Sequence, residues 1–135
     1  MKTGTFSLTS TQVMELIDIT AQVNELPLQK HNSGLLFLYN PHTTAGLTIN
    51  EGADPDVRTD IIDGLRAMVP LDYPYKHLEG NAAAHLMATL TGASVTLAVA
   101  SGRLVLGTWQ RLFFCEYDGP RNRTLHWQIL SSEQG

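Results

Sequence analysis

Hydrophobic and polar residues alternate over short stretches at both ends of the chain, in a pattern that favours strands. Residues 6–9 alternate, residues 15–20 form a second short segment, and residues 34–39 form a continuous apolar run. Such a run is typical of a central strand that is buried on both faces. Further strands are expected at residues 46–50, 94–100, 104–116 with a break at Gly107, and 124–131.

The clearest helix is predicted to begin after Asp54. Asp54 suits the N-cap, Pro55 suits the first helical position, and Asp56 favours the positive end of the helix dipole. Pro70 ends the pattern. The apolar positions between them fall within about 140° of arc at 100° per residue: Val57, Ile61, Ile62, Leu65, Met68 and Val69.

Two weaker helical segments complete the pattern. One runs from about residue 81 to residue 90, and Gly92 suits the position just past its end. The other covers residues 21–31, where Pro27 interrupts it. Strands dominate both ends of the chain, without regular βαβ alternation. We therefore expect one α+β domain over residues 1–135, with largely antiparallel sheets.

Composition narrows the class of protein. The chain is 43% hydrophobic and 16% charged, and its net charge of −4 argues against a nucleic-acid partner. No apolar run approaches the roughly 20 residues of a membrane helix, and the N-terminus lacks the apolar centre of a signal peptide. One cysteine, Cys115, excludes an internal disulfide and fits a reducing compartment. We expect a cytoplasmic protein that binds neither nucleic acid nor membranes.

Three histidines occupy positions that suit a site. His42 follows the apolar run, and loops at strand ends commonly carry binding residues. His77 and His85 would lie about 12 Å apart along one continuous helix, too far to share a metal. Gly80 interrupts that helix and permits His77 to fold back over His85. The alternatives stay open: His42 caps the following turn, and His85 is a solvated residue on an exposed face.

The helix over residues 81–90 places its polar residues apart from its large apolar ones. Leu86, Met87 and Leu90 centre on one side, which we expect to face the core. Asn81 and His85 are four residues apart and lie together on roughly the opposite side. The sequence therefore predicts that His85 does not belong to the core face.

Arg58 lies inside the apolar arc of the first helix. Either its stem packs while its guanidinium reaches solvent, or its planar group contacts an anion in a pocket. Glu51 stands just before the same helix, where a carboxylate serves as a ligand or general base, or caps the helix. Gly107 to Gln110 interrupts a strand, which suggests a bulge at the rim of a site.

Taken in order, these segments closely resemble the YjbQ-like family, also described as secondary thiamine-phosphate synthases. The resemblance implies a YjbQ-like fold of two packed, mainly antiparallel β-sheets with a few helices. It also implies a homotrimer whose site lies near subunit boundaries and uses His42, His77 and His85, here expected as metal ligands. The segments that carry it are His42 to Ala45, Asn50–Glu51, Asp54 to Arg58, Tyr75 to His85, and Ser101 to Gln110.

The activity that the resemblance implies is weak thiamine-phosphate synthesis. A pyrimidine diphosphate loses diphosphate and is captured by a thiazole phosphate, which requires a neutralised leaving group and a pocket that excludes water. We expect Glu51 and Arg58 to be catalytic, and a small phosphorylated metabolite to be the partner. The expected substrate contacts are Thr43, Thr44, Asn81 and Gln110.

The expected cofactor is a divalent metal ion. Three imidazoles suit zinc or another transition metal, whereas magnesium prefers oxygen ligands and would accompany a diphosphate substrate. Three functions stay open on this basis. The first is the transferase, the second a zinc-type hydrolase or lyase with Glu51 as base, and the third a non-catalytic trimer that binds a metal or an anion.

Overall fold

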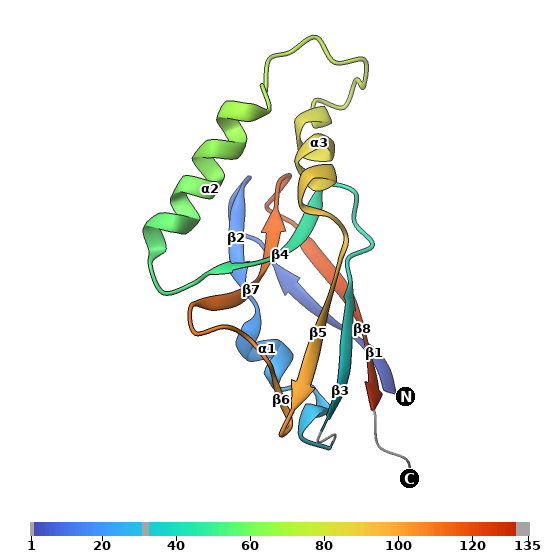
Figure 1. Cartoon of the computed structure of the whole chain (residues 1–135). Coiled ribbons are helices and arrows are strands. Elements are labelled where there is room, and N and C mark those ends of the chain that lie inside the picture. The colour runs from blue at the N-terminus through green and yellow to red at the C-terminus, as the bar shows by residue number, and fades with distance from the viewer. Residues whose placement is uncertain (1, 31–32, 132–135) are drawn as a thin grey trace.

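Strands form two antiparallel sheets in the computed structural model, which describes residues 2–30 and 33–131 (Figure 1). The larger sheet has the order β1 (Lys2–Thr9), β8 (Asn122–Ser131), β3 (Ser33–Tyr39), β5 (Ser94–Ala100) and β6 (Arg103–Leu104). The smaller sheet has the order β2 (Glu15–Asp18), β7 (Gln110–Glu116) and β4 (Ala45–Glu51). This architecture confirms the expected α+β class with two antiparallel sheets.

The main core lies between the two sheets. Alternate residues of each strand point inward, so both inner faces contribute apolar side chains. The larger sheet contributes Leu36, Leu38, Leu125 and Ile129, and the smaller sheet contributes Leu47, Leu112 and Phe114.

A second cluster covers the outer face of the smaller sheet. There Phe113 and Cys115 of β7 pack against residues of α2 (Pro55–Met68) and α3 (Ala82–Thr91). Burial raises the pKa of the Cys115 thiol to about 12, as expected for a packed, unreactive cysteine. The central part of β7 is therefore buried on both faces, which explains its continuous apolar run.

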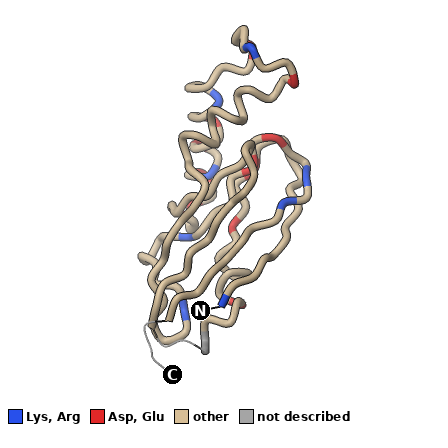
Figure 2. Tube along the Cα trace, turned by 90° about the vertical axis from the view of Figure 1, so that its right-hand side faces the viewer, with Lys and Arg blue, Asp and Glu red and all other residues tan. Residues whose placement is uncertain are grey.

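The larger sheet is covered on one face only. β3 is central, between β8 and β5, yet Leu35, Phe37 and Tyr39 on its outer face are 38–46% exposed. The prediction that residues 34–39 are buried on both faces is therefore wrong within this chain. Figure 2 shows few charged positions along these strands, and β3 and β5 contain no Lys, Arg, Asp or Glu.

The α2 helix begins and ends as predicted. The Asp54 side chain accepts a hydrogen bond of 2.9 Å from the backbone N–H of Asp56, and Pro55 occupies the first turn. Residues 21–31 differ from the prediction of one helix. α1 (Thr20–Asn24) is followed by a 3₁₀ turn, η1 (Pro27–Lys30), because proline removes a backbone donor. Residue 31 lies outside the described residues.

The α3 helix packs through Ala83, Ala84 and Met87, which are buried, whereas Leu86 and Leu90 are 45% and 57% exposed. The predicted core face is therefore right for Met87 and wrong for Leu86 and Leu90. The physical reason is the close approach of this helix to β4. A Cβ atom at Gly46 would lie 2.1 Å from Thr91 Oγ1, which leaves no room for a leucine between them. No helix in the described part of the chain is long and apolar enough to cross a membrane.

Candidate functional site

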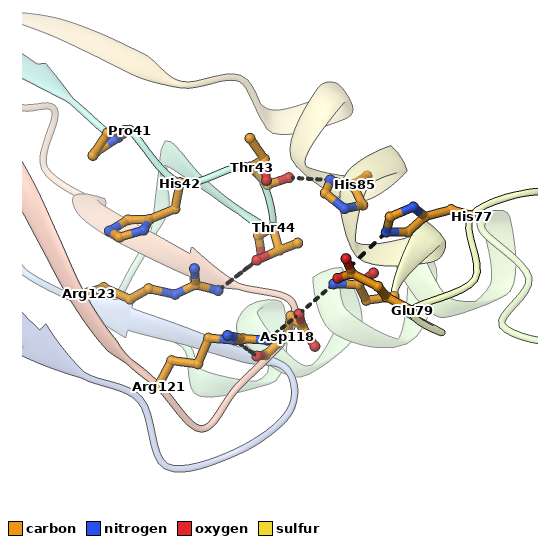
Figure 3. A pocket seen from close by; sticks show the side chains of 11 residues that line it. Pro41, His42, Thr43, Thr44, His77, Glu79, His85, Asp118, Arg121 and Arg123 are labelled. Atoms are coloured by element: carbon orange, nitrogen blue, oxygen red, sulfur yellow. Dashed lines mark hydrogen bonds and ion pairs between the residues drawn. The ribbon is translucent and has the colours of Figure 1, made fainter.

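A pocket of about 460 Å³ opens where β3 ends (Figure 3). Its walls come from the β3–β4 turn, the segment before α3 with the first turn of α3, and the β7–β8 loop. The volume lies within the range of small-molecule sites. The lining residues are Pro41, His42, Thr43, Thr44, His77, Glu79, Asn81, His85, Asp118, Arg121 and Arg123.

Asn40 fixes the β3–β4 turn that carries His42. Its side chain is buried, donates to the backbone carbonyl of Ala45 at 2.9 Å, and accepts the backbone N–H of His42 at 3.0 Å. Sequence reasoning did not assign Asn40. The available signal was Asn-Pro after an apolar run, a pair that favours turns because the asparagine side chain replaces backbone hydrogen bonds.

The His42 side chain hydrogen-bonds to the backbone of β8 just beyond the point where β3 and β8 stop pairing. β3 and β8 pair last at Tyr39 and His126, and the His42 Nε2 atom lies 2.9 Å from the backbone nitrogen of Thr124. Burial and the nearby Arg123 charge lower the pKa of His42, so the ring is mainly neutral at pH 7. Nε2 also lies 3.0 Å from the carbonyl oxygen of Thr124, so either tautomer of the neutral ring makes one hydrogen bond to that residue. In the tautomer whose Nε2 accepts the Thr124 N–H, the ring proton is on Nδ1.

His85 is oriented by the same turn. Its Nδ1 atom lies 3.1 Å from the carbonyl oxygen of Thr43. A carbonyl only accepts, so Nδ1 donates and the neutral ring keeps an unprotonated Nε2, which faces the cavity in Figure 3. The His77 ring packs edge-to-face against His85 with centroids 5.2 Å apart. His77 Nε2 lies 3.8 Å from the Glu79 carboxylate.

A buried ion pair lies beneath the pocket. Glu116 is fully buried and Arg123 is 4% exposed. Arg123 donates from Nε to Glu116 Oε1 at 2.8 Å and from Nη2 to Oε2. Nη2 also donates to Thr44 Oγ1 at 3.0 Å. Burial alone would raise the pKa of Glu116, but hydrogen bonds from Arg123, Ser10 and the Asp118 N–H lower it.

Asp118 joins the β7–β8 loop to the start of α3. Its Oδ2 atom accepts from Arg121 Nη2 and from Asn81 Nδ2, both at 2.9 Å. Sequence reasoning did not assign Asp118, Glu116 or Arg123 to the site. The one signal for Glu116 was a charged residue within the apolar run of β7.

The structure brings together six of the nine residues that the sequence assigned to the site. All six line the pocket: His42, Thr43, Thr44, His77, Asn81 and His85. The other three, Glu51, Arg58 and Gln110, lie near the opposite end of the smaller sheet. Glu51 ends β4, and a seven-residue strand separates its two ends by about 20 Å.

Glu51 and Gln110 have local hydrogen-bond partners at that end, whereas the buried Nε of Arg58 makes no hydrogen bond to the described residues. Glu51 accepts the backbone N–H groups of Ala53 and Asp54 at 2.7 and 2.9 Å, so it orders the approach to α2. Gln110 accepts the N–H of Gly107 at 2.8 Å. The Arg58 guanidinium stacks 4.9 Å above the Phe113 ring. None of the three reaches the histidine pocket of its own chain.

The three histidines do not form a metal-binding set in the described part of the chain. No group of three or more His, Cys, Asp or Glu side chains there is arranged to hold a metal ion. The reason is local, because His42 Nε2 meets the backbone of Thr124 and His85 Nδ1 meets that of Thr43. Within the described residues of one chain the three imidazoles are therefore not arranged as a ligand set, and the metal site stays a prediction.

Two packed antiparallel sheets, with helices on the outer face of the smaller one and a histidine-lined pocket at one end, define the class as an α+β protein. The family model described as UPF0047 protein YjbQ-like matches residues 4–132. The chain belongs to this family, which confirms the resemblance.

Relatives from bacteria and archaea agree with this assignment. The chain is 46% identical to UPF0047 protein YugU of Bacillus subtilis, with 93% of this chain and 97% of YugU covered. It is 44% identical to UPF0047 protein MJ1081 of Methanocaldococcus jannaschii, with 88% and 87% covered. The crystal structure of hypothetical protein APE1520 from Aeropyrum pernix K1 is similar with a TM-score of 0.90 and 40% identity, covering 98% of this chain and 100% of that chain.

Proposed function

We propose that the protein is an enzyme that binds a small phosphorylated metabolite in the histidine pocket and transfers protons through imidazoles. The observation that carries the proposal is the orientation of two histidines by backbone groups. His85 presents an unprotonated Nε2 to the cavity, and His42 carries its proton on Nδ1 in the tautomer whose Nε2 accepts the Thr124 N–H. One pocket thus combines a hydrogen-bond acceptor and a donor, as general acid–base catalysis requires.

The first reaction to test is transfer of a pyrimidine from its diphosphate to a thiazole phosphate. The pocket volume suits reactants of that size. Arg121 and Arg123 supply donors for phosphate oxygens, but each also faces a carboxylate, Asp118 or Glu116. A free diphosphate would therefore lack net neutralisation, and we expect this substrate to arrive as its magnesium complex.

Diphosphate release in the presence of both substrates tests this proposal. His85→Asn should lower the rate by about 10²–10⁴-fold, the usual contribution of a general acid or base. Gln22→Ala is the control, because Gln22 is exposed on α1, outside the pocket lining. Equal rates for wild type and His85→Asn would reject the role of His85. If no release occurs, the same pair of variants is applied to a screen of phosphorylated metabolites.

A metal-dependent hydrolase or lyase is the second candidate. The close contact of His77 and His85 favours it, because two imidazoles already stand side by side. The described residues supply no third ligand, so a bound metal requires one from the substrate or from a neighbouring subunit. Elemental analysis of protein purified without an affinity tag tests this candidate. Stoichiometric zinc would support it, and its absence would leave the metal-free site.

We also propose that the protein is a homotrimer. The support is the outer face of the larger sheet, where Leu35, Phe37, Tyr39 and Leu130 are exposed on central strands. Contiguous apolar surface of this kind commonly marks an interface between chains. Light scattering at micromolar concentration should give about three chains per particle, and a monomer would contradict the proposal.

A further inference from the structure

Arg123 keeps one nitrogen free at the floor of the pocket. Its Nε and Nη2 atoms donate to Glu116 and Thr44. Nη1 makes no hydrogen bond to the described residues. It is also not a fully buried atom, so it retains some contact with solvent. Since the residue is 4% exposed and lines the pocket, the small exposed part includes Nη1. Two N–H donors on a buried guanidinium thus face the cavity without a protein acceptor.

His42 adds a second donor beside Arg123. The Arg123 charge acts on the His42 ring, and both side chains line the same pocket (Figure 3). His42 Nε2 lies 2.9 Å from the backbone nitrogen and 3.0 Å from the carbonyl oxygen of Thr124. In the tautomer whose Nε2 accepts from that nitrogen, the ring proton is on Nδ1, which makes no hydrogen bond to the described residues. Donors from two side chains, one on the β3–β4 turn and one on β8, therefore gather at one place.

The charges around this place are nearly balanced. Arg121 pairs with Asp118 and Arg123 with Glu116, while Glu79 stands at the rim next to His77. Two guanidinium groups thus face three carboxylates. The floor offers directed hydrogen bonds without excess positive charge. Such a site favours a group of low charge over a polyanion, because desolvating several negative charges requires matching positive ones.

We propose that Arg123 Nη1 and His42 Nδ1 form a seat for one oxyanion group of the ligand, a phosphate monoester or a carboxylate. The proposal rests on the proposed function, because it names the substrate class of the same pocket. It makes Arg123 a residue that contacts the ligand as well as a partner of Glu116. It also predicts that free diphosphate binds no more tightly than inorganic phosphate.

Nuclear magnetic resonance of the wild-type protein tests the seat without any substitution. Inorganic phosphate, acetate and inorganic diphosphate are titrated separately, and the guanidinium signals of Arg123 and the ring signals of His42 are followed. We expect saturable shifts of both residues, and the anion that causes them identifies phosphate or carboxylate as the source. Shifts confined to Arg121, His77 and His85 would overturn the seat and leave the proposed function standing. The absence of any binding by these anions would overturn both.

Arg123→Lys provides an independent test. Lysine retains the positive charge toward Glu116 but lacks the guanidinium group that carries Nη1. Phosphate affinity should fall by about 10-fold or more, the effect of losing a charge-assisted hydrogen bond. Arg121→Lys is the matched control at the rim and should change the affinity less. An Arg123→Lys protein that folds and binds phosphate like wild type would overturn the proposal. If this variant does not fold, the titration of the wild-type protein decides.

Discussion

The two ends of the smaller sheet differ in how their polar side chains are used. At the end formed by Ala45 and Glu116, the neighbouring imidazoles and guanidinium groups keep atoms that face a cavity. At the end formed by Glu51 and Gln110, the predicted site residues hydrogen-bond to nearby backbone groups. Polar side chains that hydrogen-bond to the backbone of their own loop stabilise that loop. Polar side chains that keep free donors and acceptors are available to a ligand.

The largest expected effect comes from the buried pair at the pocket end. Glu116→Gln leaves the Arg123 charge buried without its partner, which should lower the free energy of unfolding by about 3–5 kcal/mol. Asp18→Asn is the matched control at the other end, because its ion pair with Arg111 is partly exposed. Its cost should be about 1 kcal/mol or less. Denaturant unfolding measures both, and equal losses would contradict the contrast between the two ends.

Low pH should lower the free energy of unfolding, because it protonates the Glu116 carboxylate. The folded-state pKa of Glu116 lies below its ordinary value of 4.5, so the unfolded chain binds the proton more readily. The stabilisation is therefore complete above that value and is lost as pH falls through the folded-state pKa. Unfolding free energies measured between neutral and acid pH should show this decline in wild type. A slope that is unchanged in Glu116→Gln would assign the decline to other groups.

The sequence predicted the local elements better than the contacts between them. The cap at Asp54 and the strand at residues 94–100 follow from residue types within a few positions, and both are confirmed. The ion pair between Glu116 and Arg123 joins strands of different sheets, so no local sequence pattern predicts it. The open face of β3 likewise depends on what covers the sheet, which a run of apolar residues does not specify.

Only part of the candidate site was predicted, because the site also depends on contacts between distant elements. His42, His77 and His85 line one pocket because a turn, a loop and a helix meet there. Glu51 and His42 are close in sequence, but the extended β4 strand between them separates them in space. Proximity along the chain therefore did not place Glu51 in the histidine pocket of its own chain.

A smaller effect is expected for Arg58, at the far end. Arg58→Met removes the stacking of the guanidinium on Phe113 and should lower the free energy of unfolding by about 0.5–1 kcal/mol. Leu65, an apolar residue about two turns further along the same face of α2, gives a reference for packing losses when changed to alanine. A loss of several kcal/mol for Arg58→Met would contradict the view that Arg58 contributes mainly through the Phe113 ring.

The central claim is that backbone groups hold two imidazoles of one pocket in defined tautomers. Long-range proton–nitrogen correlation spectra of the histidine rings, recorded at pH 8, test it most directly. We expect both His42 and His85 to carry the proton on Nδ1, with His42 Nε2 accepting from the Thr124 N–H rather than donating to the Thr124 carbonyl, and His85 Nδ1 donating to Thr43. A proton on Nε2 of His85 would remove the acceptor from the cavity and contradict the proposed acid–base function.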